Sequence, residues 1–210
     1  MKPANPEEYL KKTEHAVLHL YQGLASCWAY YERALQFWDV TKAGQPLSPE
    51  KKANLDLYLK LAGKYLDLKF SEATFAGSIL QVAAMGIRYF SRNETIPASC
   101  VRIVPPTTSN AIAFCVGKEL YGLPVGLIIY AARNQYNHWD EKPHDVTMNV
   151  FGALSNIFHD SILYDLAFDI SNPSITIYAN EVLLAVLGWN TYAKYEAEFQ
   201  DLLSRARGEI

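Results

Sequence analysis

A row of apolar side chains near the amino terminus recurs every three or four residues from Leu10 to Trp38. Asn5-Pro6-Glu7-Glu8 precedes the row and offers a capping side chain, a proline suited to the first turn and two acids, in the order that a helix start favours. The row consists of Leu10, Val17, Leu20, Tyr21, Leu24, Trp28, Tyr31, Leu35 and Trp38. This spacing predicts one long amphipathic helix, with a broad apolar stripe, that runs to about Val40.

A second helix start, Ser48-Pro49-Glu50, repeats the same capping chemistry. Apolar residues at helical spacing follow it to Asn93, with a kink or restart near Lys69, so we expect long helices to fill residues 6–93. Four basic residues lie among the positions expected to face solvent: Lys51, Lys52, Lys60 and Lys64. We interpret them as a solvated charged face rather than a track for nucleic acid.

The rest of the chain predicts further helices joined by one long loop. Prolines forbid a continuous helix across residues 93–108, where Val101 to Val104 favours a short extended piece. Beyond the loop we expect helices at 109–121, 124–139 and in 144–205, and residues 174–178 have the alternation of one short strand. The sequence therefore predicts an all-α bundle of about five to seven helices in a single domain, residues 1–210.

Composition narrows the classes of partner. The formal charge is −3, whereas proteins that bind long nucleic-acid duplexes through their phosphates carry an excess of basic residues. Aromatic residues make up 13% of the chain and charged residues only 20%, which favours an oligomer or a protein partner. The three cysteines, Cys27, Cys100 and Cys115, have no metal-binding spacing and are typical of reduced thiols in the cytoplasm. No membrane span is expected, because glycine and proline interrupt the longest apolar stretch, residues 120–132.

Arg133, Asn134 and His138 form the most chemically suggestive group in the sequence. An apolar run precedes them and Pro143 follows, so they lie where a buried helix surfaces and ends. Arginine offers a planar fork that matches phosphate oxygens, and histidine transfers protons near neutral pH. Five steps of about 100° place Arg133 and His138 roughly 140° apart on a straight helix. The two side chains converge only if the last turn loosens, tightens or bulges.

The pattern Arg133-Asn134, three further residues and His138 resembles the motif of the HEPN superfamily, whose members are all-α proteins. The resemblance covers the motif and the apolar helix before it, and it implies a metal-independent endoribonuclease that needs no cofactor. In that reaction the RNA 2′-hydroxyl attacks the adjacent phosphate and leaves a 2′,3′-cyclic phosphate and a 5′-hydroxyl. His138 would move the proton, Arg133 would hold the phosphoryl charge, and Asn134 would orient a neighbour or bind the substrate.

The resemblance also implies a homodimer in which two motif helices meet, and a role as a toxin with an antitoxin or in host defence. This chain departs from the toxin subgroup at Asp140, where that subgroup has a tyrosine two residues after the histidine. We therefore do not extend the modification of that tyrosine to this chain.

Metal binding, other catalytic motifs and a non-catalytic role are the alternatives to this interpretation. His15 and His19 are one turn apart, but no Glu-x-x-His lies inside a predicted helix, so a metal site is not expected. The commonest hydrolase and nucleotide-binding motifs are absent from the sequence. Arg133 could instead pair with an acid at the helix end. The alternative function is a non-catalytic helical interaction or regulatory protein.

Overall fold

The computed structural model describes residues 3–38, 47–106, 109–158, 168 and 179–208. Within these ranges the chain forms eight α-helices and a single two-stranded hairpin. The all-α fold class predicted from the sequence is therefore confirmed. The strand predicted at residues 174–178 lies outside the described residues.

The first helix, α1, spans Pro6–Leu35. Its start follows the predicted chemistry, because the Asn5 side chain accepts a hydrogen bond of 2.8 Å from the backbone N–H of Glu8. Val17 and Leu24 of its apolar stripe are completely buried. The helix ends at Leu35, short of the predicted Val40.

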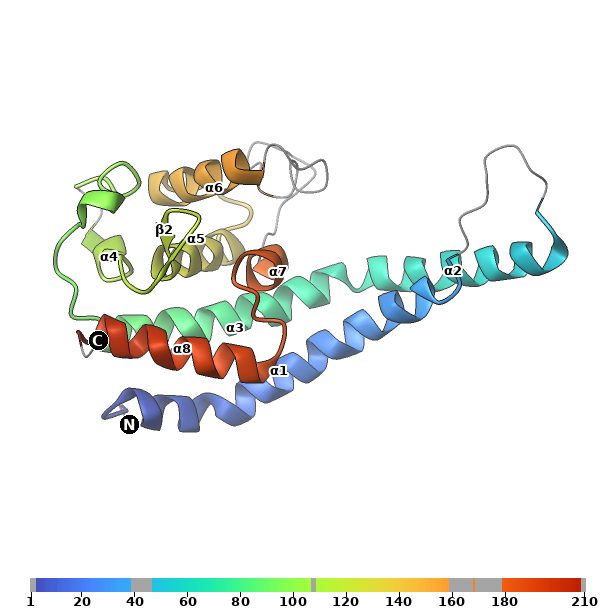
Figure 1. Cartoon of the computed structure of the whole chain (residues 1–210), viewed down its shortest axis with the longest axis horizontal. Coiled ribbons are helices and arrows are strands. Elements are labelled where there is room, and N and C mark those ends of the chain that lie inside the picture. The colour runs from blue at the N-terminus through green and yellow to red at the C-terminus, as the bar shows by residue number, and fades with distance from the viewer. Residues whose placement is uncertain (1–2, 39–46, 107–108, 159–167, 169–178, 209–210) are drawn as a thin grey trace.

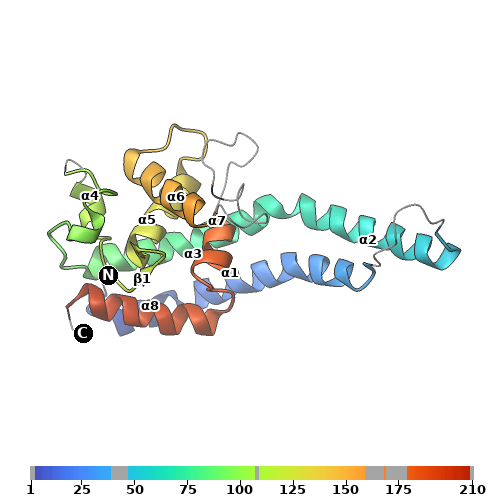
Figure 2. The same ribbon diagram turned by 45° about the horizontal axis from the view of Figure 1, so that its top comes forward.

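Two further helices, α2 (Pro49–Asp67) and α3 (Lys69–Phe90), follow almost without interruption. Leu68 between them keeps a near-helical backbone, with φ −93° and ψ −2°. In Figures 1 and 2, α2 continues the line of α3, and the second half of α1 lies beside it. These two segments form an arm that projects beyond the rest of the molecule, and we call the described residues 31–38 and 47–70 the arm.

The body of the molecule is built around α3, which packs against α1, α5 (Val125–Asn137), α7 (Ala179–Glu181) and α8 (Tyr192–Ala206). Helix α6 (Asp145–Phe158) covers α5 on the side away from α3 (Figure 1). By length and composition alone α3 would suffice to cross a membrane, but 56% of its apolar window is buried inside the protein. One such helix is also typical of a buried core element.

The final predicted helix is divided into pieces. A π-helical turn, Val182–Val186, follows α7, and Gly188 then takes a left-handed φ of +69°. Glycine adopts this conformation without the penalty that a side chain would bring, so the chain can turn before α8 begins. Trp189 next to this turn is completely buried in the core.

Two local predictions between α3 and α5 are wrong. Val101 to Val104 is not extended, because a short 3₁₀ turn at Ala98–Cys100 continues into hydrogen-bonded turns. The helix predicted at residues 109–121 is reduced to α4, Ser109–Ile112. The chain then forms a hairpin of β1 (Glu119–Leu120) and β2 (Leu123–Pro124), whose turn residues Tyr121 and Gly122 both have positive φ.

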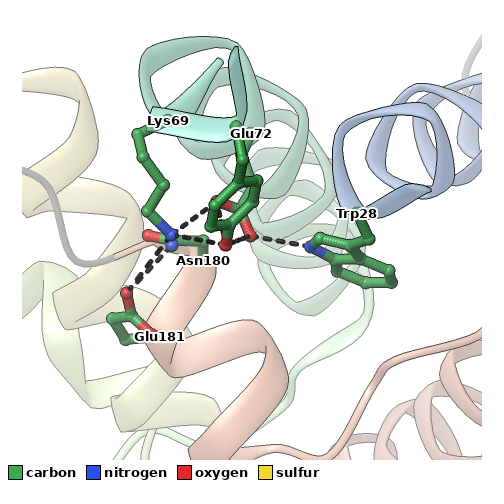
Figure 3. Close-up of polar contacts among 6 residues, drawn as sticks. Trp28, Lys69, Glu72, Asn180 and Glu181 are labelled. Carbon is green, nitrogen blue, oxygen red and sulfur yellow. Dashed lines mark hydrogen bonds and ion pairs between the residues drawn. The ribbon is translucent and has the colours of Figure 1, made fainter. Parts of the chain in front are cut away.

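A buried carboxylate joins the arm to the body. Glu72 of α3 is 1% exposed and accepts hydrogen bonds from Trp28 Nε1 (2.7 Å) and Lys69 Nζ (2.6 Å). The Tyr65 hydroxyl of α2 adds longer bonds, and Lys69 also lies 4.0 Å from Glu181 of α7. Figure 3 shows these groups converging from α1, α3 and α7. The cluster links four helices at the base of the arm, and its charges are paired.

We expect Glu72→Gln to lower the free energy of unfolding by about 1–3 kcal/mol, because Lys69 loses its buried ionic acceptor while the shape stays the same. Thermal unfolding measures this as a fall in Tm of roughly 5 °C. Glu8→Gln is the control: its carboxylate pairs with Lys12 at an exposed position (2.6 Å), so this substitution should leave the Tm nearly unchanged. Equal effects of the two substitutions would contradict the structural role of Glu72.

Candidate functional site

The helix that carries the Arg133 motif is held tightly against the chain before it. Gly126, in the first turn of α5, donates its N–H to the Val116 carbonyl at 3.1 Å. A Cβ added at Gly126 would overlap the backbone carbonyl of Phe114. Residues 127–129, 131 and 132 are then buried in the core of their own chain. Little apolar surface of α5 is therefore left for a second copy, and the predicted contact between two motif helices stays a prediction.

Arg133 is held by amide oxygens. Its Nε donates to Gln81 Oε1 of α3 at 2.6 Å, and one terminal nitrogen donates to Asn134 Oδ1 at 2.8 Å. Asn137 donates to the same Gln81 oxygen at 3.1 Å. No carboxylate among the described residues pairs with Arg133. The guanidinium is thus oriented without being neutralised, which suits the binding of an anion.

His138 lies where α5 stops being helical. Its N–H still bonds to the Asn134 carbonyl at 3.0 Å, but its φ of −127° and ψ of 39° leave the helical region. The helix therefore loosens at the residue where convergence with Arg133 requires it. The ring nitrogen Nδ1 lies 3.0 Å from Glu141 Oε1. Since a carboxylate only accepts, Nδ1 carries the hydrogen of that bond, and Nε2 of a neutral ring keeps its lone pair.

Arg133, Asn134 and His138 line one pocket of about 460 Å³. Twelve of the described residues line this pocket and none of these twelve is acidic, although the whole chain carries a net charge of −3. Three aromatic side chains also line it: Tyr89, Phe114 and Tyr130. The pocket thus combines cationic and aromatic groups, a combination that favours phosphates and nucleobases.

Two further residues that can be cationic, Arg88 and His144, line the pocket and were not predicted as site residues from the sequence. Arg88, from the last turn of α3, lies against Asn110, which accepts from its terminal nitrogens at 3.4 and 3.2 Å. His144, just before α6, has its ring centroid 6.5 Å from that of His138. Arg88 belongs to no recognisable motif, comes from another helix, and only the fold places it beside Arg133. The signal for His144 was the spacing Glu141-x-x-His144, which spans Pro143 and therefore predicted no metal site.

A smaller hollow adjoins this pocket. His138 and His144 line it together with Thr147 of α6, whose buried hydroxyl forms no hydrogen bond within the described structure. The two histidines thus border both spaces. An unpaired hydroxyl beside them is a donor or acceptor that a bound ligand or a water molecule would satisfy.

Comparison with known protein families, curated proteins and solved structures finds no match for this chain. Its function must therefore be argued from the pocket itself. Among the described residues no three His, Cys, Asp or Glu side chains gather as a metal site requires. His15 and His19 of α1 stack edge to face, with ring centroids 4.3 Å apart, and neither lines the pocket.

Proposed function

We propose that this pocket is the active site of a metal-independent endoribonuclease of HEPN type. The observation that carries the proposal is the meeting of Arg133, Arg88, His138 and His144 in one pocket with no carboxylate among its described lining residues. A phosphodiester brings one negative charge to the pocket, and the charge increases on the phosphoryl oxygens as a nucleophile attacks. Unpaired guanidinium groups stabilise that charge, and imidazoles near it exchange protons.

The reaction requires two proton transfers. The RNA 2′-hydroxyl loses a proton as its oxygen bonds to phosphorus, and the 5′-oxygen gains one as its bond to phosphorus breaks. In the proposal, His138 Nε2 accepts the first proton, because Glu141 occupies Nδ1. His144, whose ring centroid lies 6.5 Å from that of His138, supplies the second. The products are a 2′,3′-cyclic phosphate and a 5′-hydroxyl, so the nucleophile belongs to the substrate.

The remaining polar residues position the cations. Arg133 contacts the phosphoryl oxygens, and the Asn134 side chain holds the Arg133 guanidinium through its 2.8 Å hydrogen bond. Asn134 is only 7% exposed, which suits a positioning residue better than a substrate contact. Arg88 provides a second cation for an adjacent phosphate. Tyr89, Phe114 and Tyr130 offer ring faces on which a base can stack.

A short fluorescent RNA tests this function. The protein in excess EDTA should cleave it and leave cyclic phosphate and 5′-hydroxyl ends, which mass spectrometry identifies. A matched RNA with 2′-deoxy sugars at the cleaved positions should resist, because the attacking hydroxyl is missing. Cleavage of the deoxy substrate at the same positions would exclude this mechanism. Complete absence of cleavage over a panel of RNA sequences would exclude the enzyme.

The alternative function, a non-catalytic interaction protein, is favoured by a different observation. Exposed apolar side chains gather on the arm, away from the pocket. A protein without RNA cleavage but with a partner bound at the arm would fit this alternative. The two functions make opposite predictions for the EDTA experiment.

A further inference from the structure

The arm carries most of the exposed large apolar side chains in the described structure. Nine of the fifteen such residues lie between Tyr31 and Phe70. Helix α2 is 19 residues long, yet Leu61 is its single buried residue. A helix with so little burial within its own chain gains little stability from tertiary packing. Its apolar side chains therefore favour contact with another molecule.

Four of these side chains form a continuous stripe. Leu55, Leu59, Leu66 and Phe70 are 36%, 56%, 67% and 67% exposed. Leu55, Leu59 and Leu66 lie within about 40° of each other around the axis of α2, and Phe70 continues their line at the start of α3. This is the spacing of helices that pack side by side with a partner helix.

The other side of α2 is already occupied. Tyr65 packs on Tyr31 of α1 with ring centroids 5.1 Å apart, and Tyr58 packs on Trp38 at 4.8 Å. Lys64 lies over the Tyr30 ring at 5.6 Å. These contacts hold α2 against α1 and leave the leucine stripe facing outward. The stripe thus belongs to the outer surface of a two-helix arm.

Charges of alternating sign flank one edge of the stripe. Lys52, Asp56, Lys60 and Asp67 lie in this order along α2, all are exposed, and none forms an ion pair with a described residue. When a second copy of α2 packs antiparallel, the same edge of each helix faces its copy. With the two-fold axis near residue 59, Lys52 then lies within about two residues of the position opposite Asp67, and Asp56 within about two residues of the position opposite Lys60, offsets that these side chains can span. In a parallel copy this edge would instead face the opposite edge of the other helix, so these charges would not meet one another.

The size of the surface also fits a second copy. Helix α2 is about 28 Å long at 1.5 Å per residue. A helix is about 10–12 Å across, so two arms packed along that length bury on the order of several hundred Å² on each protomer, toward the lower end of the range for specific interfaces. The contact is isologous, so a two-fold axis closes it and no further copies are added.

We propose that two copies of this protein associate through their arms, with the two α2 stripes packed antiparallel about a two-fold axis. The contact lies at the far end of the molecule from α5 (Figure 1), so the Arg133 pocket of each copy stays open. It does not depend on the proposed ribonuclease activity. It is also distinct from a contact between two motif helices.

Light scattering after size-exclusion chromatography, in reducing buffer at about 50 µM protein, tests the proposal at concentrations where standard interfaces associate. The wild type should elute with twice the chain mass of 23.7 kDa. Leu59→Glu with Leu66→Glu should elute as a monomer with an unchanged circular dichroism spectrum. Val101→Glu, at an exposed apolar position outside the arm, should remain dimeric. A monomeric wild type, or a dimer that survives the double substitution, would overturn the proposal.

A charge exchange tests the orientation and does not depend on the leucine variants folding. Lys52→Glu alone should weaken the dimer by about 10-fold, because it faces Asp67 of the other copy. Lys52→Glu together with Asp67→Lys should restore the wild-type dissociation constant in sedimentation equilibrium. If the double variant is as weak as the single one, the antiparallel arrangement is wrong.

Discussion

Replacing Arg133 by alanine is expected to lower the rate of RNA cleavage by about 10²–10³-fold, the effect of removing one preorganised donor from a developing oxyanion. His138→Ala should lower it by about 10²–10⁴-fold, because a group that transfers a proton is lost. Arg133→Lys should fall between the wild type and alanine, since lysine keeps the charge and loses the planar fork. Single-turnover cleavage of a fluorescent RNA measures all three rates.

Substitutions outside the pocket show whether the loss of activity is specific to the pocket or follows from removing any arginine or histidine. Arg102 is an exposed arginine in the 93–108 loop and does not line the pocket, so Arg102→Ala should keep the wild-type rate. His15→Ala, on the exposed surface of α1, should do the same. If all four alanine variants cleave equally, the activity comes from elsewhere or from a contaminating nuclease.

Gly126→Ala is expected to be the most destabilising of the small substitutions. The added methyl group would overlap the backbone carbonyl of Phe114, and backbone atoms move only with the elements that carry them. Overpacking of this kind costs about 3 kcal/mol, which corresponds to a fall in Tm of roughly 10 °C for a chain of this size. Differential scanning calorimetry or circular dichroism measures the shift.

Gly63→Ala in α2 is the matched control, because no described atom lies within 4 Å of the added Cβ. An alanine in an open helical position stabilises by about 0.5–1 kcal/mol relative to glycine. The two substitutions are therefore expected to shift Tm in opposite directions. A neutral Gly126→Ala would mean that α5 and residue 114 are not packed as closely as the structure shows.

Helix starts were predictable wherever local chemistry decides them. Asn5 and Ser48 cap their helices through the hydrogen bonds that their side chains predict. The region 109–121 was not predictable, because its apolar content suits a helix or a buried turn equally well. There the outcome depends on Gly117 and Tyr121, whose positive φ values fit the chain against α8 and into a hairpin.

The helix of the arm was predictable from the sequence, but the exposure of its leucines was not. The spacing of Leu55, Leu59 and Leu66 predicted a helix, and α2 is a helix. Periodicity reports which side of a helix is apolar but not what covers it. These leucines are exposed in the isolated chain.

The candidate site was predictable in part for a similar reason. Arg133, Asn134 and His138 are neighbours in sequence, so a motif can reveal them. Arg88 joins them through the packing of α3 against α5, which a single sequence does not encode locally. Asp140 and Glu141 directly follow the motif, yet neither is among the described residues that line the pocket, and this too is a property of the fold.

Titration with inorganic phosphate, followed by NMR of the histidine ring protons, tests whether Arg88, Arg133, His138 and His144 share one anion-binding pocket. His138 and His144 should shift together along one saturable curve, with His15 unchanged as the internal control. Arg133→Ala should weaken that binding by about 10-fold, the loss of one charge-assisted contact. If the ring-proton signals of His138 and His144 do not move with phosphate, or move no more than those of His15, the pocket does not bind anions as proposed.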